Sequence, residues 1–347
     1  MEYHTVKIST TQTKCSPVEK LKSLRPSIQP IIVLSEGNDC RIIGAAIKAT
    51  KIDIAKIILL GDEVVIKTKL AKQNYHSSGI SIHDPSKSSL SGEFCEIYYN
   101  LRKNKGLTID QAFLAVQTPL IYASLMVQTG RASGTISGAV ETTADVIRVA
   151  IQVIGKSPTS PIVSSCFIIN MPSKLEEKIR SMIFSDCGLV INPNEKQLAA
   201  IAISASRSCK DFLDQEPIVA MLSFSTKGSA KDKSISKITK ALRLVQHQHP
   251  KLLIDGEMQF DTAFAPDVAI RKAPKSKVAG IANVMVFPNL DSGNIGYKIA
   301  QQIRGAQAIG PILQGLNKPA NDLSRNCSIE DILQMIAVTG LQVSRGK

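Results

Sequence analysis

The sequence feature that most constrains the fold is an alternation of short, continuous apolar runs with amphipathic segments. The first unit consists of the apolar run Ile31–Leu34, a polar loop, a helical pattern at 41–49 and a second apolar run at 54–60. Short continuous apolar runs are typical of strands buried on both faces, as in parallel sheets. Because parallel strands require crossover connections, usually helices, this alternation predicts an α/β fold.

The same alternation continues almost to the end of the sequence. Further strands are predicted at 80–83, 135–140, 162–169, 189–191, 218–224, 252–254 and 284–287. A segment rich in Pro and Ser at 156–161 is the best candidate for an interdomain linker, since these residues interrupt helices and strands. With 347 residues, the chain has the length of about two domains or one large one.

Composition narrows the classes of partner. The net charge is +13, but the basic residues are spread along the chain and aromatic residues make up only 4%. Nucleic-acid-binding surfaces usually concentrate basic residues together with stacking aromatics, so an anionic small molecule is the better-supported partner. The 7 cysteines are scattered without a Cys-x-x-Cys pair, which argues against a disulfide framework and a zinc site. The sequence shows neither a membrane-spanning stretch nor a signal peptide, so a cytoplasmic location is expected.

The densest group of chemistry-bearing side chains lies in the segment 311–332, which has the pattern of an exposed loop running into a helix. Ser324, Arg325 and Asp331 fall close together there. Ser328 precedes an apolar-periodic run and Asp331 follows three residues later, the pattern of an N-cap with an acidic N3 residue. From the residues alone, turn and cap roles are the simpler explanation of Ser324 and Asp331.

A second candidate site precedes a helix predicted at 146–154. Gly138 permits a ligand to approach the backbone closely, and Thr142 and Thr143 are placed to cap the helix. The free N–H groups at a helix N-terminus suit an anion. Arg148 falls about one turn inside this helix, where a surface salt bridge is the alternative to a binding role.

Several familiar motifs are missing. The sequence contains no Walker A motif, no nucleophile elbow, no His-Glu-x-x-His and no complete Gly-x-Gly-x-x-Gly fingerprint, which argues against a dehydrogenase. The segment Gly293-Asn-Ile-Gly296, at the start of a helix predicted for 295–303, is a weak candidate for a phosphate-binding turn.

Similarity to a known protein family extends over nearly the whole chain and is strongest after about residue 130, where several segments occur in the same order as in that family. The segments are SGAVETTADVIRVAIQVIG (137–155), SSCFII (164–169), FSDCGLVINPNEKQLAAIAI (184–203), VAMLSFSTKGSA (219–230), IDGEMQFDTAFAPDVAIRKAP (254–274), VFPNLDSGNIGYKIAQ (286–301) and GPILQGLNKPANDLSR (310–325). In these segments the chain resembles the phosphate acetyltransferases (phosphotransacetylases) of the phosphate acetyl/butyryltransferase family.

The resemblance implies a reversible acyl transfer: acetyl-CoA and inorganic phosphate give acetyl phosphate and CoA, with CoA as a substrate and with no metal or cofactor. It implies two α/β domains like those of isocitrate/isopropylmalate dehydrogenases, with a cleft between them, in a homodimer. In that fold the chain returns to its first domain. The expected first domain is therefore discontinuous, with residues 1–157 and 311–347, and the second comprises 158–310. A metabolic link to an acetate kinase is also implied.

The resemblance also implies roles for individual residues. The Ser-Arg pair of NDLSR falls on Ser324 and Arg325, which would stabilise a developing oxyanion. The aspartate at the start of the next helix falls on Asp331, the expected base for the CoA thiol. Arg148 would hold phosphate, and Arg102, in the LRKNKG segment, would meet a phosphate of CoA. The other binding residues expected from the SGA…TTAD motif are Ser137, Gly138, Thr142 and Thr143.

The chain departs from the family pattern at three positions. Glu141 stands where the family commonly has histidine, Val149 where it has proline, and Asn326 where it has glycine. Asn326 is expected to preserve a left-handed turn, whereas a carboxylate at 141 would repel phosphate. A covalent role for Cys327 is not expected, because no histidine lies nearby in sequence to activate it. The alternatives are a butyryl- or propionyltransferase, and a non-catalytic homologue that senses CoA or acetyl phosphate.

Overall fold

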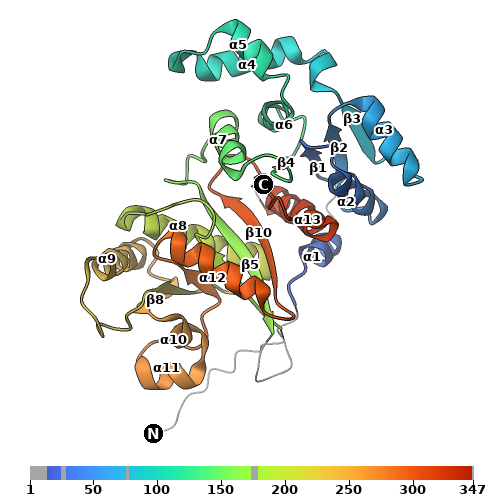
Figure 1. The fold of residues 1–347 in the computed structure, drawn as a ribbon. Helices are drawn as coiled ribbons and strands as arrows, with labels where there is room; N and C mark the ends of the chain where they lie inside the picture. Colours follow the sequence, from blue (N-terminus) through green and yellow to red (C-terminus); the bar gives the residue numbers. More distant parts are fainter. Residues whose placement is uncertain (1–13, 25–28, 76–77, 173–178, 346–347) are drawn as a thin grey trace.

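The computed structural model describes residues 14–24, 29–75, 78–172 and 179–345, and two β-sheets form its framework (Figure 1). In this described part, the first sheet has five strands in the order β11-β4-β1-β2-β3, with parallel pairing throughout. Its strands are β1 (Ile31–Leu34), β2 (Lys56–Leu60), β3 (Ile80–His83), β4 (Gly134–Ser137) and β11 (Ala320–Asp322). The parallel α/β architecture predicted from the apolar runs is confirmed.

Helices cover both faces of the first sheet, because its strands carry apolar side chains on both sides. Ile32 and Leu34 pack on one face, and Val33 packs on the other. The first face is covered by α1 (Pro17–Leu24), α2 (Cys40–Lys51), α3 (Glu63–Lys72) and α13 (Ile329–Arg345). The second is covered by α4 (Ser91–Arg102), α5 (Ile109–Ala115), α6 (Pro119–Gln128) and α7 (Thr143–Val153).

The second sheet is mixed. As far as the chain is described, its order is β10-β5-β6-β9-β7-β8, with antiparallel pairing at the β10-β5-β6 side and parallel pairing elsewhere. Its strands are β5 (Ser164–Pro172), β6 (Ile179–Ser185), β7 (Ile218–Leu222), β8 (Leu253–Met258), β9 (Val284–Val286) and β10 (Gln307–Gln314). Its helices are α8 (Glu195–Ser208), α9 (Lys233–Gln248), α10 (Phe260–Phe264), α11 (Pro266–Lys272) and α12 (Leu290–Gln302).

The strand predicted at 189–191 is wrong. The buried carboxylate of Asp186 accepts hydrogen bonds from the N–H groups of Gly188, Leu189 and Val190, at 2.9, 3.1 and 3.1 Å. A side chain therefore takes the backbone donors that a sheet ladder would need. The prediction missed β6, which ends immediately before Asp186. It also missed β10 and β11, and the end of β10 and all of β11 lie in the segment 311–332 that was expected to be an exposed loop.

The phosphate-binding turn predicted at Gly293–Gly296 is also wrong. Both glycines lie inside α12, whose N-cap is Asn289. A side chain at 293 would place its Cβ atom 2.2 Å from the carbonyl oxygen of Asp186. Gly293 is thus required by the close approach of α12 to the turn after β6.

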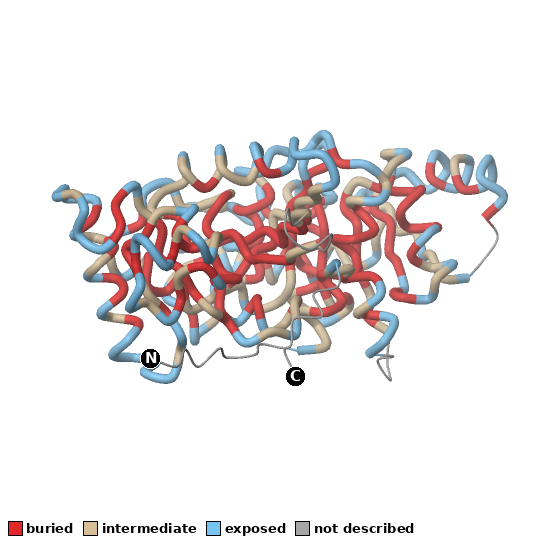
Figure 2. Tube along the Cα trace, turned by 90° about the horizontal axis from the view of Figure 1, so that it is seen from below, coloured by how far each residue is buried: buried red, intermediate tan, exposed pale blue. Residues whose placement is uncertain are grey.

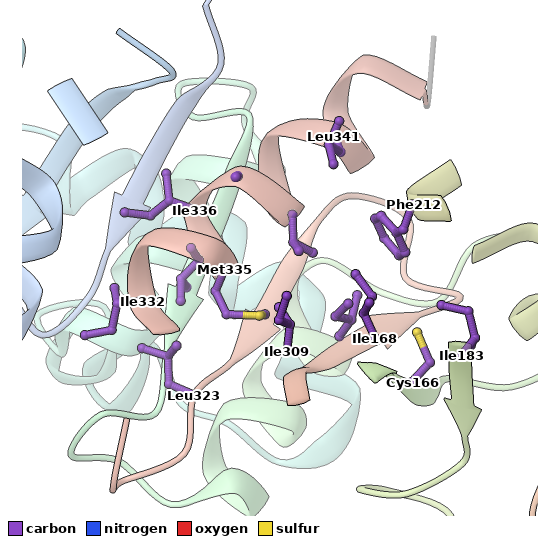
Figure 3. Packing of buried hydrophobic residues seen from close by; sticks show 14 of the residues in the cluster. Cys166, Ile168, Ile183, Phe212, Ile309, Leu323, Ile332, Met335, Ile336 and Leu341 are labelled. Carbon is purple, nitrogen blue, oxygen red and sulfur yellow. The ribbon is translucent and has the colours of Figure 1, made fainter. Parts of the chain in front are cut away.

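Helix α13 lies between the two sheets. Figure 3 shows Met335 and Ile336 of α13 in the same buried cluster as Ile309 of β10 and Ile168 of β5. Figure 2 shows the buried segments running through the middle of the molecule. Pairing of β10 with β5 continues to Gln314, past the predicted domain boundary at 310, whereas β11 pairs with β4. The division into domains stays a prediction. No helix in the described ranges is both long and apolar enough to cross a bilayer.

Candidate active site

The carboxyl ends of β1, β4 and β11 meet at one edge of the first sheet. Asp322 at the end of β11 pairs with Ser137 at the end of β4, and Leu34 of β1 pairs with Ile136. The sheet continues from β1 through β2 to β3, and from β4 to β11 on the other side. In open α/β sheets, ligands bind outside the carboxyl ends of the strands at such a reversal of strand order. This edge brings the two candidate segments, after β4 and after β11, side by side.

The segment after β4 is held tightly. The buried hydroxyl of Ser137 accepts a hydrogen bond from Ser35 Oγ at 2.7 Å, and its carbonyl accepts one from the N–H of Leu323 at 2.8 Å. Gly138 follows with φ +108°, a conformation that only glycine adopts readily. A Cβ atom on Gly138 would lie 2.2 Å from Asp322 Oδ1. Ser137 and Gly138 therefore lie against β11 within the candidate site.

Glu36 occupies the backbone donors of this loop. Its carboxylate accepts hydrogen bonds from four consecutive N–H groups, at 3.2, 2.8, 2.8 and 2.8 Å. The donors are Gly138, Ala139, Val140 and Glu141. Sequence analysis did not assign Glu36 a role; its place two residues after the first strand, at a carboxyl end, was the available signal.

The N-terminus of α7 carries three of the predicted residues. Thr142 is the N-cap: its hydroxyl accepts from the N–H of Asp145 at 3.2 Å and donates to the Asp145 carboxylate at 2.7 Å, which lowers the pKa of Asp145. Thr143 is the first helical residue. The Arg148 guanidinium forms an exposed ion pair with Asp145. The salt-bridge alternative for Arg148 is therefore present in the structure, at the edge of the candidate site.

The segment after β11 forms a turn and then a helix cap. The N–H of Cys327 donates to the carbonyl of Ser324 at 2.9 Å, and Ser324 and Arg325 are exposed. Asn326 does not have a positive φ, so the expectation of a left-handed turn there is wrong. A turn closed by the Cys327 N–H needs no left-handed residue at 326.

The predicted N-cap at the start of α13 is confirmed. Ser328 Oγ accepts from the N–H of Asp331 at 3.2 Å, and Asp331 Oδ2 accepts from the N–H of Ser328 at 2.9 Å. These two bonds form a reciprocal capping box. Asp331 Oδ2 also accepts from Ser328 Oγ at 2.8 Å, whereas Oδ1 has no partner within the described residues. The cap therefore orients the Asp331 carboxylate and leaves one oxygen available.

Arg41 joins the two segments, and sequence analysis missed it. Its Nη2 atom donates to the carbonyl of Ala139 at 2.9 Å, and its Nη1 atom donates to the carbonyls of Arg325 and Cys327 at 2.6 and 3.2 Å. An ion pair with Asp39, the N-cap of α2, fixes the guanidinium group. One side chain thus holds the loop after β4 against the loop after β11.

Asp322 and Cys327 are buried beneath these loops. Burial raises the pKa of Asp322 to about 6, with Thr143 and the N–H of Leu323 acting in the opposite direction. Burial raises the pKa of the Cys327 thiol to about 11, although the Arg41 charge opposes the shift. A neutral thiol is a poor nucleophile.

Arg102 is placed differently from the other predicted residues. It ends α4, which lies with α5 at the outer end of the molecule in Figure 1. Within the described chain, its guanidinium has no hydrogen bond or ion pair with any of the candidate residues. No group of three or more His, Cys, Asp and Glu side chains in the described ranges is arranged to hold a metal ion.

A protein-family model described as phosphate acetyl/butaryl transferase matches residues 17–340 of the chain. The chain belongs to this family. It is 42% identical over 326 residues to the phosphate acetyltransferase of Paracoccus denitrificans, covering 94% of this chain and 99% of that protein. It is 44% identical over 311 residues to the phosphate acetyltransferase of Acetivibrio thermocellus, covering 90% of this chain and 93% of that protein.

Solved structures of the family have the same fold. A phosphotransacetylase from Streptococcus pyogenes superposes with a TM-score of 0.88 at 38% identity, covering 94% of this chain and 98% of that one. A 4-hydroxythreonine-4-phosphate dehydrogenase from Burkholderia phymatum superposes with a TM-score of 0.52 at 11% identity, covering 91% of this chain and 99% of that one. The second likeness concerns the fold alone, and agrees with the predicted dehydrogenase-like architecture.

Proposed function

We propose that this chain is a phosphate acetyltransferase, which moves an acetyl group reversibly between CoA and inorganic phosphate. The observation that carries the proposal is membership of the family over residues 17–340, with relatives of this activity at 42% identity along almost their whole length. The edge formed by β4 and β11 supports it, because the two segments that hold most of the predicted residues meet there.

In the proposed reaction, a phosphate oxygen attacks the thioester carbonyl carbon, the C–S bond breaks and the CoA thiolate leaves. Arg148 and the N-terminus of α7 would bind the phosphate. Ser324 and Arg325, both exposed, would stabilise the oxyanion. In the reverse direction Asp331 would take the thiol proton, and Oδ1 is the oxygen that its cap leaves free. Arg102 would contact CoA.

The finer parts of the proposal extend beyond the reaction. They are a homodimer, a cytoplasmic location, a metabolic link to an acetate kinase, and a cleft between the domains 1–157 with 311–347 and 158–310. The scheme uses CoA as a substrate and needs no metal or cofactor. Butyryl or propionyl transfer is the alternative activity, and a non-catalytic sensor of CoA or acetyl phosphate is the alternative class.

The test is the phosphate-dependent loss of the acetyl-CoA thioester, measured beside butyryl-CoA and propionyl-CoA and repeated with arsenate. Transfer to arsenate gives an acyl arsenate, a mixed anhydride that hydrolyses spontaneously, so the loss of thioester with arsenate becomes irreversible. Preferred turnover of acetyl-CoA is expected. Faster turnover of butyryl-CoA would make butyryl transfer the assigned activity. Binding of CoA without turnover of any thioester would overturn the enzyme proposal in favour of the sensor.

A further inference from the structure

Asp322 is a buried carboxylate whose side-chain oxygens form no hydrogen bond of normal length among the described residues. It ends β11 and is 1% exposed. A buried carboxylate without a hydrogen bond is costly when ionised, because its charge has lost water. The Thr143 side chain and the N–H of Leu323 offset only part of this cost, since the pKa of Asp322 stays raised at about 6. Such a group in a candidate site needs an explanation.

The carboxyl group of Asp322 lies beside Gly138 and the N-terminus of α7. Its Oδ1 atom lies 2.2 Å from the position that a Cβ atom on Gly138 would take, and Thr143, the first residue of α7, is close enough to favour its charged form. Gly138 leaves space that any other residue would fill with a Cβ atom. The carboxyl group is therefore directed at the helix N-terminus, which is the anion site of the proposed function.

A second carboxylate lies on the other side of the same loop. Glu36 binds the N–H groups of residues 138–141, and its charge raises the pKa of Asp322 further. The charged groups on the elements and loops around Asp322 are Glu36, Arg41, Glu141, Asp145, Arg148, Arg325, Glu330, Asp331 and Arg345. Asp145 and Arg148 pair with each other, and Arg41 pairs with Asp39. Among the described residues, no cation pairs with Asp322.

An anion at this helix N-terminus would add a further negative charge beside Asp322. Like charges in close proximity favour the protonated form of one partner, most strongly where water is excluded. Protonation of Asp322 removes the repulsion and leaves the N–H groups and Arg148 to attract the anion. A proton from solvent adds to the carboxylate as the anion enters and leaves again as it departs.

We propose that Asp322 takes up a proton when the tetrahedral anionic substrate binds, so that occupancy of the site is coupled to protonation of this residue. The inference rests on the proposed function for the identity of the anion. Asp322 acts through its charge and needs no direct contact with the reacting atoms. If the site binds the anion only when Asp322 is protonated, the apparent affinity falls in proportion to the fraction of protein in which Asp322 is protonated.

The probe is inorganic sulfate, a tetrahedral dianion that does not itself titrate between pH 5 and pH 9. Its binding to the intact protein is measured by titration calorimetry in two buffers with different ionisation enthalpies, which yields the number of protons taken up. The wild type is expected to take up close to one proton per sulfate at pH 8. Its dissociation constant should rise by up to about tenfold per pH unit above pH 6.

Asp322→Asn keeps the shape of the side chain and cannot change charge. We expect it to bind sulfate without proton uptake, with an affinity at pH 8 close to that of the wild type at pH 5.5. The matched control is Glu141→Gln, an exposed acidic residue in the same loop, which should retain the proton uptake.

Three outcomes overturn the inference: no proton uptake by the wild type, no sulfate binding by the wild type, or unchanged uptake in Asp322→Asn. The wild-type measurement decides even where the variant does not fold. The acetyl-CoA assay on the same preparation separates the two proposals. Proton-coupled sulfate binding without turnover rejects the proposed function alone, and turnover without coupling rejects the role of Asp322 alone.

Discussion

The backbone N–H of Glu141 donates to the carboxylate of Glu36 at 2.8 Å, so two acidic residues are joined through the main chain. The Glu141 side chain is exposed and forms no ion pair among the described residues. The carboxylate that replaces the family's usual histidine therefore lies at the surface of the candidate site and is not part of its hydrogen-bonded framework. Its effect should be electrostatic.

Glu141→Gln should lower the KM for phosphate roughly two- to fivefold at low ionic strength, because an unpaired negative charge near the proposed anion site is removed. The melting temperature should not change. Added salt should erase the difference, since exposed charges are screened. Steady-state kinetics at two ionic strengths provide the measurement, with Glu96→Gln on α4 as the control. A salt-independent change in KM would show that Glu141 acts by direct contact.

Ser328 and Asp331 allow the cap and the base to be separated. Ser328→Ala removes the cap hydroxyl, which should cost about 1 kcal/mol of stability while leaving the Asp331 carboxylate in place. Its turnover should stay within a few-fold of the wild type. Asp331→Asn should lower turnover at least about a hundredfold, because it removes the proposed base for the thiol, with little change in the KM for CoA.

Urea unfolding and initial rates on both variants test this separation. A loss of turnover in Ser328→Ala as large as that in Asp331→Asn would mean that the helix start, rather than the carboxylate, supports the reaction. Wild-type turnover in Asp331→Asn would leave Asp331 with a capping role alone.

Arg148→Ala should raise the KM for phosphate at least about tenfold and leave the KM for acetyl-CoA within twofold, because forked guanidinium groups hold phosphate best. The exposed ion pair that Arg148 forms with Asp145 contributes little to stability. Arg271→Ala is the matched control, since Arg271 forms an exposed pair with Asp267 on α11. An unchanged dependence of rate on phosphate would remove Arg148 from the site.

Local patterns predicted β1, β2, β3 and β4 of the first sheet, but not β11, which lies in a segment expected to be a loop. The run Ile31–Leu34 became β1 at the predicted residues, since a continuous apolar stretch has a favourable place only where both faces are covered. The cap at Ser328 followed from spacing within one helical turn. The strand at 189–191 failed because Asp186 captures its backbone donors, an interaction that no apolar pattern reveals.

The candidate site depends on contacts that local patterns do not contain. The family resemblance drew attention to Ser324 and Arg148, whereas the parallel pairing of β11 with β4 explains why their segments lie together. Glu36 and Arg41 were missed because their partners are more than ninety residues distant and are mostly backbone atoms. Backbone carbonyl and N–H groups occur at every residue, so the sequence carries no mark of which ones a distant side chain will bind.

Cys327→Ala should keep turnover within about threefold of the wild type. Burial raises the pKa of this thiol to about 11, so it is neutral at pH 7.5 and neither a nucleophile nor easily alkylated. Mass spectrometry after brief treatment with iodoacetamide should find Cys327 unmodified. Cys40, which is exposed, serves as the internal control. Rapid alkylation of Cys327 with parallel loss of activity would contradict this assignment.

Asp322→Asn should stabilise the folded protein at pH 8. Burial raises the pKa of Asp322 in the folded protein to about 6 from its ordinary value of 3.8. Between these values the folded state binds more protons than the unfolded state, so the Asp322 contribution falls as pH rises. The contribution of Asp322 to the free energy of unfolding is fully present below pH 3.8 and is lost as the pH rises through 6. At pH 8 the buried charge should cost about 1–3 kcal/mol, which a neutral amide of the same shape avoids.

Urea unfolding of the wild type and Asp322→Asn at pH 4, 6 and 8 measures this difference. The gain should be largest at pH 8, because the wild type then holds an ionised, unpaired carboxylate in its interior. Towards pH 4 it should disappear, since both side chains are then neutral in the folded state. Asp110→Asn, at an exposed position in α5, should show no comparable gain. Equal stabilities at pH 8 would mean that the Asp322 charge is compensated in solution, and the argument for proton uptake on anion binding would lose its basis.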